Sequence, residues 1–256
     1  MKMLAVLCGL LGALVATQAS AAAGVNLRWS NCFSDGGAID RTSACNSNVG
    51  TAGTLVGSFE TSAPVTGVRQ LNFTVDLASA GAALPDWWRF NAPGGIVGCR
   101  GTALTMNAVI SIAAVQCFDW SEGQAVGAVQ SYQVGVPAGP TTARLTLTTG
   151  VLSPGLDLVP ATEYFAFNVL IVNAKTTGTG SCAGCSTPMC VFIRQMFMTT
   201  EDGRSLGFAG STHGADSFYV TWQGGVGVGS LIGTGCPNAT PTRNSTWGAV
   251  KSLYHD

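Results

Sequence analysis

The sequence has little charge and only two histidines. Of the 256 residues, 10% are charged, with 12 Lys and Arg against 13 Asp and Glu, so the formal net charge is −1. Nucleic acids and anionic membranes attract proteins with a basic excess, so we expect neither as a partner. The histidines, His213 and His255, lie far from the Cys-x-x-Cys motif at 182–185. No zinc pattern, nucleotide loop or calcium loop is present, and we expect no cofactor and no metal.

The N-terminus carries a charge-free apolar run that is too short to anchor the chain in a bilayer. Met1-Lys2 is a short basic start, Met3–Ala16 has no charge, and Thr17–Ala21 ends in Ala-x-Ala. These are the features of a secretory signal peptide. We expect residues 1–21 to be removed, leaving no membrane span. The mature chain should be secreted or extracytoplasmic, in the periplasm, at the cell surface or outside the cell.

Sustained helical periodicity is almost absent, and glycine occupies 34 positions. Short runs of β-branched and aromatic residues alternate with polar ones and end at Gly, Pro, Asn or Ser, which is typical of strands. With 46% hydrophobic residues the chain should fold. We expect one all-β domain over residues 22–234, an antiparallel two-sheet sandwich of jelly-roll type. The expected strands are Val25–Ser30, Thr54–Phe59, Val65–Leu77, Ala128–Val134, Thr142–Thr149, Tyr164–Val172, Cys190–Met198 and Phe218–Trp222.

Three segments allow more detailed expectations. Val65–Leu77 is long enough to form two half-strands bent at a bulge. Tyr164–Val172 and Cys190–Met198 flank a glycine-rich loop, which favours a hairpin closed by the cysteines in that loop. Thr102–Gln116 is compatible with a short helix or with a buried strand.

An even number of cysteines in a secreted chain predicts a disulfide framework. The simplest pairing joins sequence neighbours, which gives Cys32–Cys45 and Cys99–Cys117. For the last four, Cys185–Cys190 with Cys182–Cys236 and the crossed pairing stay equally open. The Cys-x-x-Cys motif lies in a Gly/Thr/Ser loop, so we expect structural disulfides there rather than redox or metal chemistry. The candidates after residue 21 are Cys32, Cys45, Cys99, Cys117, Cys182, Cys185, Cys190 and Cys236.

The last residues, 235–256, read as a proline-bearing tether followed by a short helix. Ser245 or Thr246 can serve as the N-cap. Two helical turns are unstable alone, so this helix should either cover the end of the sandwich or be presented to sorting or assembly machinery. Its apolar face would consist of Trp247, Val250, Leu253 and Tyr254.

Short segments spread over nearly all of the chain after residue 21 form a recognisable set. They are Asn26–Cys32, Ala44–Asn48, Leu55–Phe59, Leu84–Trp88, Gly180–Cys185, Thr221–Gly225 and Thr246–Tyr254, the last with the form W-G-x-V-K-x-L-Y. Together they resemble a group of uncharacterised secreted, disulfide-containing proteins from environmental bacteria. The resemblance implies membership of that group and carries no activity, substrate or catalytic residue.

Signals of catalysis are weak. Gly203–Gly207 has the Gly-x-Ser-x-Gly spacing around Ser205, but a nucleophile elbow needs a strand, a sharp turn and a helix. Here a hairpin-like turn precedes the motif and more glycine follows it. Glycosidic chemistry needs two carboxylates in one cleft, and the sequence places no two of its acids together. The acids considered are Glu60, Asp86, Asp119, Glu122 and Glu163.

Trp87 and Trp88 form the most suggestive aromatic pair. In a strand, neighbouring side chains point to opposite faces, so one ring should pack in the core and the other could contact a sugar or a protein partner. Trp222 is expected in the core. We therefore expect a non-enzymatic binding, adhesive or surface-structural module, with a carbohydrate or a cell-surface component as its partner. The alternative is an extracellular carbohydrate-active hydrolase or lyase.

Overall fold

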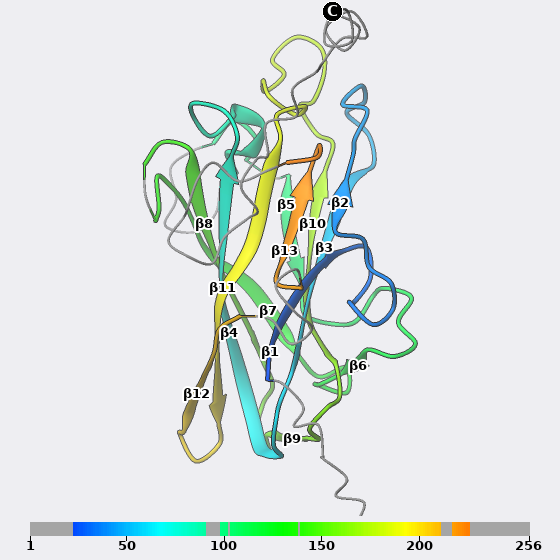
Figure 1. The fold of residues 1–256 in the computed structure, drawn as a ribbon, viewed down its shortest axis with the longest axis vertical. Coiled ribbons are helices and arrows are strands. Elements are labelled where there is room, and N and C mark those ends of the chain that lie inside the picture. Colours follow the sequence, from blue (N-terminus) through cyan, green and yellow to red (C-terminus); the bar gives the residue numbers. More distant parts are fainter. Residues whose placement is uncertain (1–22, 91–97, 102, 138, 211–216, 226–256) are drawn as a thin grey trace, which may run out of the picture.

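The structure is a computed structural model that describes residues 23–90, 98–101, 103–137, 139–210 and 217–225. The chain forms two β-sheets packed face to face, with the long strands running along the long axis of the molecule (Figure 1). The all-β sandwich expected from the sequence is confirmed.

The smaller sheet, sheet A, has five strands. Its order is β1-β3-β10-β5, and β6 pairs with β10. All pairs are antiparallel except β6 with β10. The bounds are β1 Gly24–Trp29, β3 Thr51–Glu60, β10 Tyr164–Val172, β5 Leu104–Asn107 and β6 Phe118–Asp119.

The larger sheet, sheet B, has eight strands. Its order is β2-β13-β11-β4-β8-β7, with β12 on β11 and β9 on β4. The pairs are antiparallel apart from β13 with β2. The bounds are β2 Asp40–Arg41, β13 Tyr219–Trp222, β11 Met189–Thr200, β4 Val65–Ser79, β8 Thr142–Gly150, β7 Val126–Val134, β12 Ser205–Phe208 and β9 Leu156–Leu158.

The core lies between the sheets, and long strands of sheet B such as β8 turn one face of alternating residues toward it. On β8, Ala143, Leu145 and Leu147 are buried, and the residues between them are only half-buried. Since side chains alternate across a strand, one face of the sheet turns to the core and the other to solvent. The rings of Phe73 on β4 and Phe167 on β10 meet across the interior with centroids 4.9 Å apart.

One expectation about strand pairing is wrong. β10 and β11 do not form a hairpin, because β10 lies in sheet A and β11 in sheet B. Their connecting loop therefore crosses one end of the sandwich.

The bulge expected in Val65–Leu77 is present, although β4 is one continuous strand rather than two halves. Its register against β11 shifts between Thr199 and Thr200, where β4 contributes one extra residue, Arg69.

The segment 102–116 is neither a helix nor a buried strand. Apart from residue 102, which the structure does not describe, it contains the short strand β5 and then irregular chain, in which Val109 is exposed. Its glycine-free apolar run suited both expected forms, but only four residues find a partner strand, at the edge of sheet A.

The signal peptide at 1–21 and the C-terminal segment at 235–256 lie outside the described residues, as do Cys236 and His213. The expected helix with its Trp247, Val250, Leu253 and Tyr254 face therefore has no support from the structure. Within the described ranges we find no helix with the length and hydropathy of a membrane span.

Candidate functional site

The cysteines pair between distant parts of the chain rather than between sequence neighbours. Cys190 is disulfide-bonded as well. Both expected neighbour pairs, Cys32–Cys45 and Cys99–Cys117, are wrong, and neither arrangement proposed for Cys182 and Cys185 occurs. The described bonds are Cys32–Cys117, Cys45–Cys185 and Cys99–Cys182.

The reason lies in the crossing of the β10–β11 connection. This loop carries both cysteines of the Cys-x-x-Cys motif over the end of the sandwich, where it meets loops from other strands. Cys185 is joined to Cys45 in the β2–β3 loop, and Cys182 to Cys99 in the loop before β5. Because both cysteines of the motif are in disulfides, the motif holds no thiolate for metal binding. Its role is structural, as expected. We call these joined loops the disulfide-linked end.

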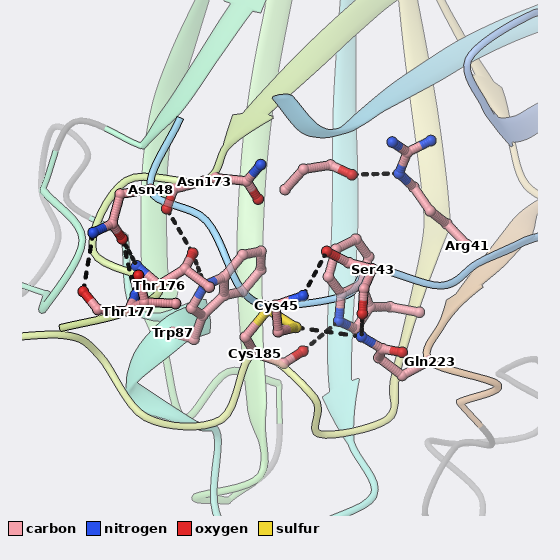
Figure 2. The surroundings of a disulfide bond; sticks show 12 residues. Arg41, Ser43, Cys45, Asn48, Trp87, Asn173, Thr176, Thr177, Cys185 and Gln223 are labelled. Atoms are coloured by element: carbon pink, nitrogen blue, oxygen red, sulfur yellow. Dashed lines mark hydrogen bonds between the residues drawn. A yellow bond between two sulfur atoms is a disulfide. The ribbon is translucent and has the colours of Figure 1, made fainter. Parts of the chain in front are cut away.

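Figure 2 shows that the Cys45–Cys185 bond sits among hydrogen bonds that fix the same loops. The Gln223 side chain donates to the Ser43 carbonyl oxygen at 2.7 Å and approaches the Cys45 sulfur at 3.4 Å. The indole N–H of Trp222 donates to the Cys185 carbonyl oxygen at 2.7 Å. The disulfide therefore connects the surface loops directly to the aromatic core.

A second set of contacts orders the glycine-rich part of the loop. Asn48 Oδ1 accepts the backbone N–H groups of Thr176 and Thr177 at 2.7 and 2.8 Å, and the Thr176 hydroxyl accepts from the Trp87 indole at 2.9 Å (Figure 2). Arg100, almost fully buried, stacks over Trp87 at 3.6 Å and donates to the Ala174 carbonyl oxygen at 3.0 Å. Burial lowers the pKa of Arg100 to about 10, so its guanidinium stays charged at neutral pH.

The expectation of one outward ring in the Trp87-Trp88 pair is wrong. The two residues form a short 3₁₀ turn, Asp86–Trp88, rather than a strand, and both side chains are fully buried. A turn does not send successive side chains to opposite faces as a strand does. Both rings contact Trp222, which is in the core as expected. In this structure neither ring offers a surface for a ligand.

Cys32, Cys117 and Asp35 lie together in an arrangement that resembles a metal site. The two sulfur atoms are bonded to each other, so they are not available as thiolate ligands. The Asp35 carboxylate accepts the backbone N–H groups of Val115, Gln116 and Cys117 at 2.9–3.1 Å. Although desolvation opposes them, these hydrogen bonds hold the Asp35 pKa below its usual value. The cluster therefore secures a loop.

Replacing Asp35 with Asn should destabilise the protein in a pH-dependent way. The folded-state pKa is lowered, so the carboxylate stabilises the fold above the unfolded pKa near 4 and loses this contribution as the pH falls through the folded value. We expect D35N to reduce the free energy of unfolding by about 1 kcal/mol at pH 7. Urea titrations at pH 7 and pH 2 would test this, with the exposed Glu122→Gln as control. An equal loss at both pH values would contradict it.

Glu163, Asp119 and Ser205, three of the residues considered for catalysis, are part of the structural framework. Glu163, nearly buried, accepts hydrogen bonds from the backbone N–H groups of Phe33 and Ser34 at 3.0 and 2.8 Å and from the Ser58 hydroxyl. Asp119 accepts from Ser121 and from the Gly123 backbone within its own turn. Ser205 begins the strand β12 and does not stand between a strand and a helix, so the nucleophile-elbow geometry is not formed.

The outer face of sheet B has a different character. Two cross-strand rows on its central strands present uncharged amide and hydroxyl side chains to solvent, and the row next to them holds the Asp76–Arg144 ion pair. One row runs Phe197–Asn72–Thr148–Ala128, the next Gln195–Thr74–Thr146–Ser131. With strands about 4.8 Å apart, each four-strand row is about 14 Å long. We call this surface the amide–hydroxyl face; its members are Gln70, Asn72, Thr74, Ser131, Thr146, Thr148, Gln195 and Thr199.

Hydrogen bonds between neighbouring strands fix the centre of the face. Asn72 Oδ1 accepts from the Thr148 hydroxyl at 2.8 Å and from Gln70 Nε2 at 3.0 Å. The hydroxyls of Ser131 and Thr146 are 2.7 Å apart. The Asn72 amide is thus oriented through its oxygen, and its NH₂ group makes no hydrogen bond within the described part of the chain. Beside it stands the Phe197 ring, 42% exposed.

A groove of about 700 Å³ continues the face toward the end of sheet B that carries β9 and β12. Gln70, Thr148 and Thr199 belong both to the face and to the groove. Its other lining residues include Arg69, Gly150, Ala128 and Leu152, the last 83% exposed. Small residues on β7 and β8 leave the space open, and bulky or polar side chains surround it.

The groove depends on a bulge in β4. At Gly67 the backbone φ is +66°, a conformation that favours glycine. Just beyond it, Arg69 is skipped in the register between β4 and β11. Bulges bend a strand and redirect a side chain, and this one places Arg69 at the groove. The polar alternation in Val65–Leu77 was the sequence signal for this face, but the register that joins Asn72 to Thr148 and Phe197 was not readable from it.

Comparisons with family models, with curated proteins and with solved structures found no match for this chain. The case for a function therefore rests on the chemistry of the amide–hydroxyl face and its groove.

Proposed function

We propose that this protein is an exported, non-enzymatic binding module that holds an extended polysaccharide across the amide–hydroxyl face and its groove. Export by a cleaved signal peptide at residues 1–21 is part of the proposal. Three described disulfides fit an oxidising, extracytoplasmic environment and support it.

The observation that carries the proposal is the arrangement around Asn72. Its oxygen is engaged by Thr148 and Gln70, so the amide is held before any ligand arrives. Its two N–H donors remain open beside an exposed aromatic ring, Phe197. Fixed donors cost little entropy on binding, and a sugar ring offers both hydroxyl oxygens for the amide and an apolar face for the phenyl ring.

The chemistry of the face favours a polysaccharide over other polymers. A protein partner would be expected to find an apolar interface core, whereas the rows here are mostly Thr, Ser, Asn and Gln. A nucleic acid would need a row of cations to neutralise phosphates. Uncharged hydrogen-bonding groups repeated over about 14 Å match a chain that presents hydroxyls along its length.

The groove favours binding over hydrolysis. Its only charged lining residue in the described part of the chain is Arg69, and its other polar groups are amides and hydroxyls. Glycoside hydrolysis by a pair of carboxylates needs two acids about 5–10 Å apart across the bond. None of the acids considered from the sequence, such as Glu163 and Asp119, lines this groove.

A glycan array tests the proposal, followed by titration of a positive oligosaccharide. We expect Phe197→Ala and Asn72→Ala each to weaken binding at least tenfold, about 1.4 kcal/mol, because each removes a contact that faces the ligand. Neither change removes core packing, so the melting temperature should move by only a few degrees.

Phe118→Ala is the matched control for the aromatic change. Phe118 is 57% exposed and lies on β6 of sheet A, away from the amide–hydroxyl face. Its loss should leave binding unchanged. Equal weakening by Phe118→Ala and Phe197→Ala, or an array without any binding glycan, would refute the proposed function.

A further inference from the structure

The groove contains one cation whose hydrogen-bonding capacity is not used. Arg69 Nε is buried and has no hydrogen-bond partner in the described part of the chain. Buried polar groups are normally satisfied, and leaving one without a partner costs free energy. The two Nη groups of Arg69 also make no hydrogen bond in the described part of the chain, and Arg69 lines the open groove. The guanidinium therefore keeps donors at its Nη end for an acceptor brought by a ligand.

Glu201, an acid on which the charge of Arg69 acts, does not take this role. Glu201 binds the Ser153 hydroxyl through Oε1 and the Gly155 backbone N–H through Oε2 at 3.0 Å. The hydrogen bond from Ser153, then that from Gly155, and last the charge of Arg69 lower the Glu201 pKa. The charge of Arg69 therefore acts on Glu201, but both carboxylate oxygens of Glu201 are engaged by the 153–155 loop. The Arg69 and Glu201 side chains form no ion pair within 4 Å.

We infer that Arg69 recognises a carboxylate on the bound polysaccharide, so that the groove prefers a uronate-containing chain to a neutral one. The inference rests on the proposed function and specifies its ligand class. The planar guanidinium can pair with a carboxylate through two parallel hydrogen bonds, which an ammonium group does not reproduce. Among the described residues, the lining contains no acid that would repel such a group.

The preference for uronates follows from the position of Arg69 relative to the face. Gln70, the next residue on β4, belongs to both the groove and the amide–hydroxyl face, and it donates to Asn72. A chain lying across Asn72 and Thr148 would therefore pass beside Arg69. The face would bind the hydroxyls common to many sugars, and Arg69 would select those with a carboxylate.

The test compares ligands that differ only in charge. Polygalacturonate and alginate oligosaccharides, each with its methyl-esterified form, are titrated against the purified protein at low salt. We expect at least one acid form to bind at least tenfold more tightly than its ester, because hydrogen bonds to charged groups contribute more than neutral ones. Arg69→Gln should remove this preference, and Arg69→Lys should keep only part of it.

Arg204→Gln is the control for a general loss of positive charge. Arg204 is exposed, pairs with Asp202 at 2.7 Å and lies outside the groove. This variant should keep the preference for the acid form. Equal affinity of acid and ester, or an equal loss of both in Arg69→Gln, would overturn the inference.

The binding of neutral polysaccharides distinguishes failure of this inference from failure of the proposed function. If neutral chains bind in a Phe197-dependent way and no uronate binds more tightly than its ester, the inference fails and the proposed function stands. If no polysaccharide of either kind binds, both fail. Thermal melts of each variant show whether it is folded, so a loss of binding is not confused with a loss of structure.

Discussion

Replacing Cys45, Cys99, Cys182 and Cys185 with alanine is expected to lower the free energy of unfolding by about 6 kcal/mol. Each bond closes a long loop, with partners separated by 140 and 83 positions in the sequence, and cross-links of this length restrict the unfolded chain most. Domains of this size are stable by only about 5–15 kcal/mol. The variant should therefore lose a large part of its free energy of unfolding.

Urea titration under non-reducing conditions measures this effect. The double variant Cys99→Ala/Cys182→Ala should lose about half as much free energy of unfolding as the four-residue variant. Asn48→Ala is the matched control, because it cuts hydrogen bonds to Thr176 and Thr177 in the same loop and leaves both disulfides intact. A loss below about 1 kcal/mol in the four-residue variant would show that packing closes this end without the disulfides.

Replacing Arg144 with Met should lower the free energy of unfolding by about 3 kcal/mol, because it leaves a buried charge without its main partner. Asp76 on β4 is fully buried, and Arg144 on β8 binds both of its oxygens at 2.7 and 2.8 Å. These hydrogen bonds also raise the Arg144 pKa. Without Arg144, the Asp76 carboxylate keeps one ionic partner among the described residues, Arg194 at 3.7 Å. Removing one partner of a buried ion pair is strongly destabilising.

The double variant Asp76→Leu/Arg144→Met distinguishes lost charge pairing from lost packing. Replacing both members of a buried ion pair with apolar residues is often close to neutral. We therefore expect the double variant to recover most of the stability that Arg144→Met loses, measured by urea unfolding at pH 7. Equal instability of the single and double variants would mean that the ion pair is not the cause.

The strands were predictable from the sequence because burial imposes a period of two. Tyr164–Val172 was predicted with the bounds that β10 has, and the other seven expected strands overlap observed ones closely. Pairing was not predictable in the same way. The hairpin expected for β10 and β11 assumed that neighbours in sequence are neighbours in space, and the same assumption led to the wrong disulfides.

The candidate site could be predicted only in part. The alternation of Gln70, Asn72 and Thr74 with apolar residues indicated a strand with a polar face. Which polar residues lie beside them depends on register between strands that are far apart in sequence, such as Asn72 with Thr148. The aromatic residue at the site is Phe197, whereas the sequence drew attention to Trp87 and Trp88, which their turn buries completely.

The position of a bound oligosaccharide on the protein can be measured directly from amide chemical shifts in NMR spectra. An oligosaccharide selected on the glycan array is titrated into ¹⁵N-labelled protein. We predict that the largest shifts fall on the side-chain amide of Asn72 and on the backbone around Thr148 and Phe197, and that in Asn72→Ala the backbone shifts need at least tenfold more oligosaccharide to reach half their full size. Shifts centred on the disulfide-linked end, or spread over sheet A, would contradict this prediction.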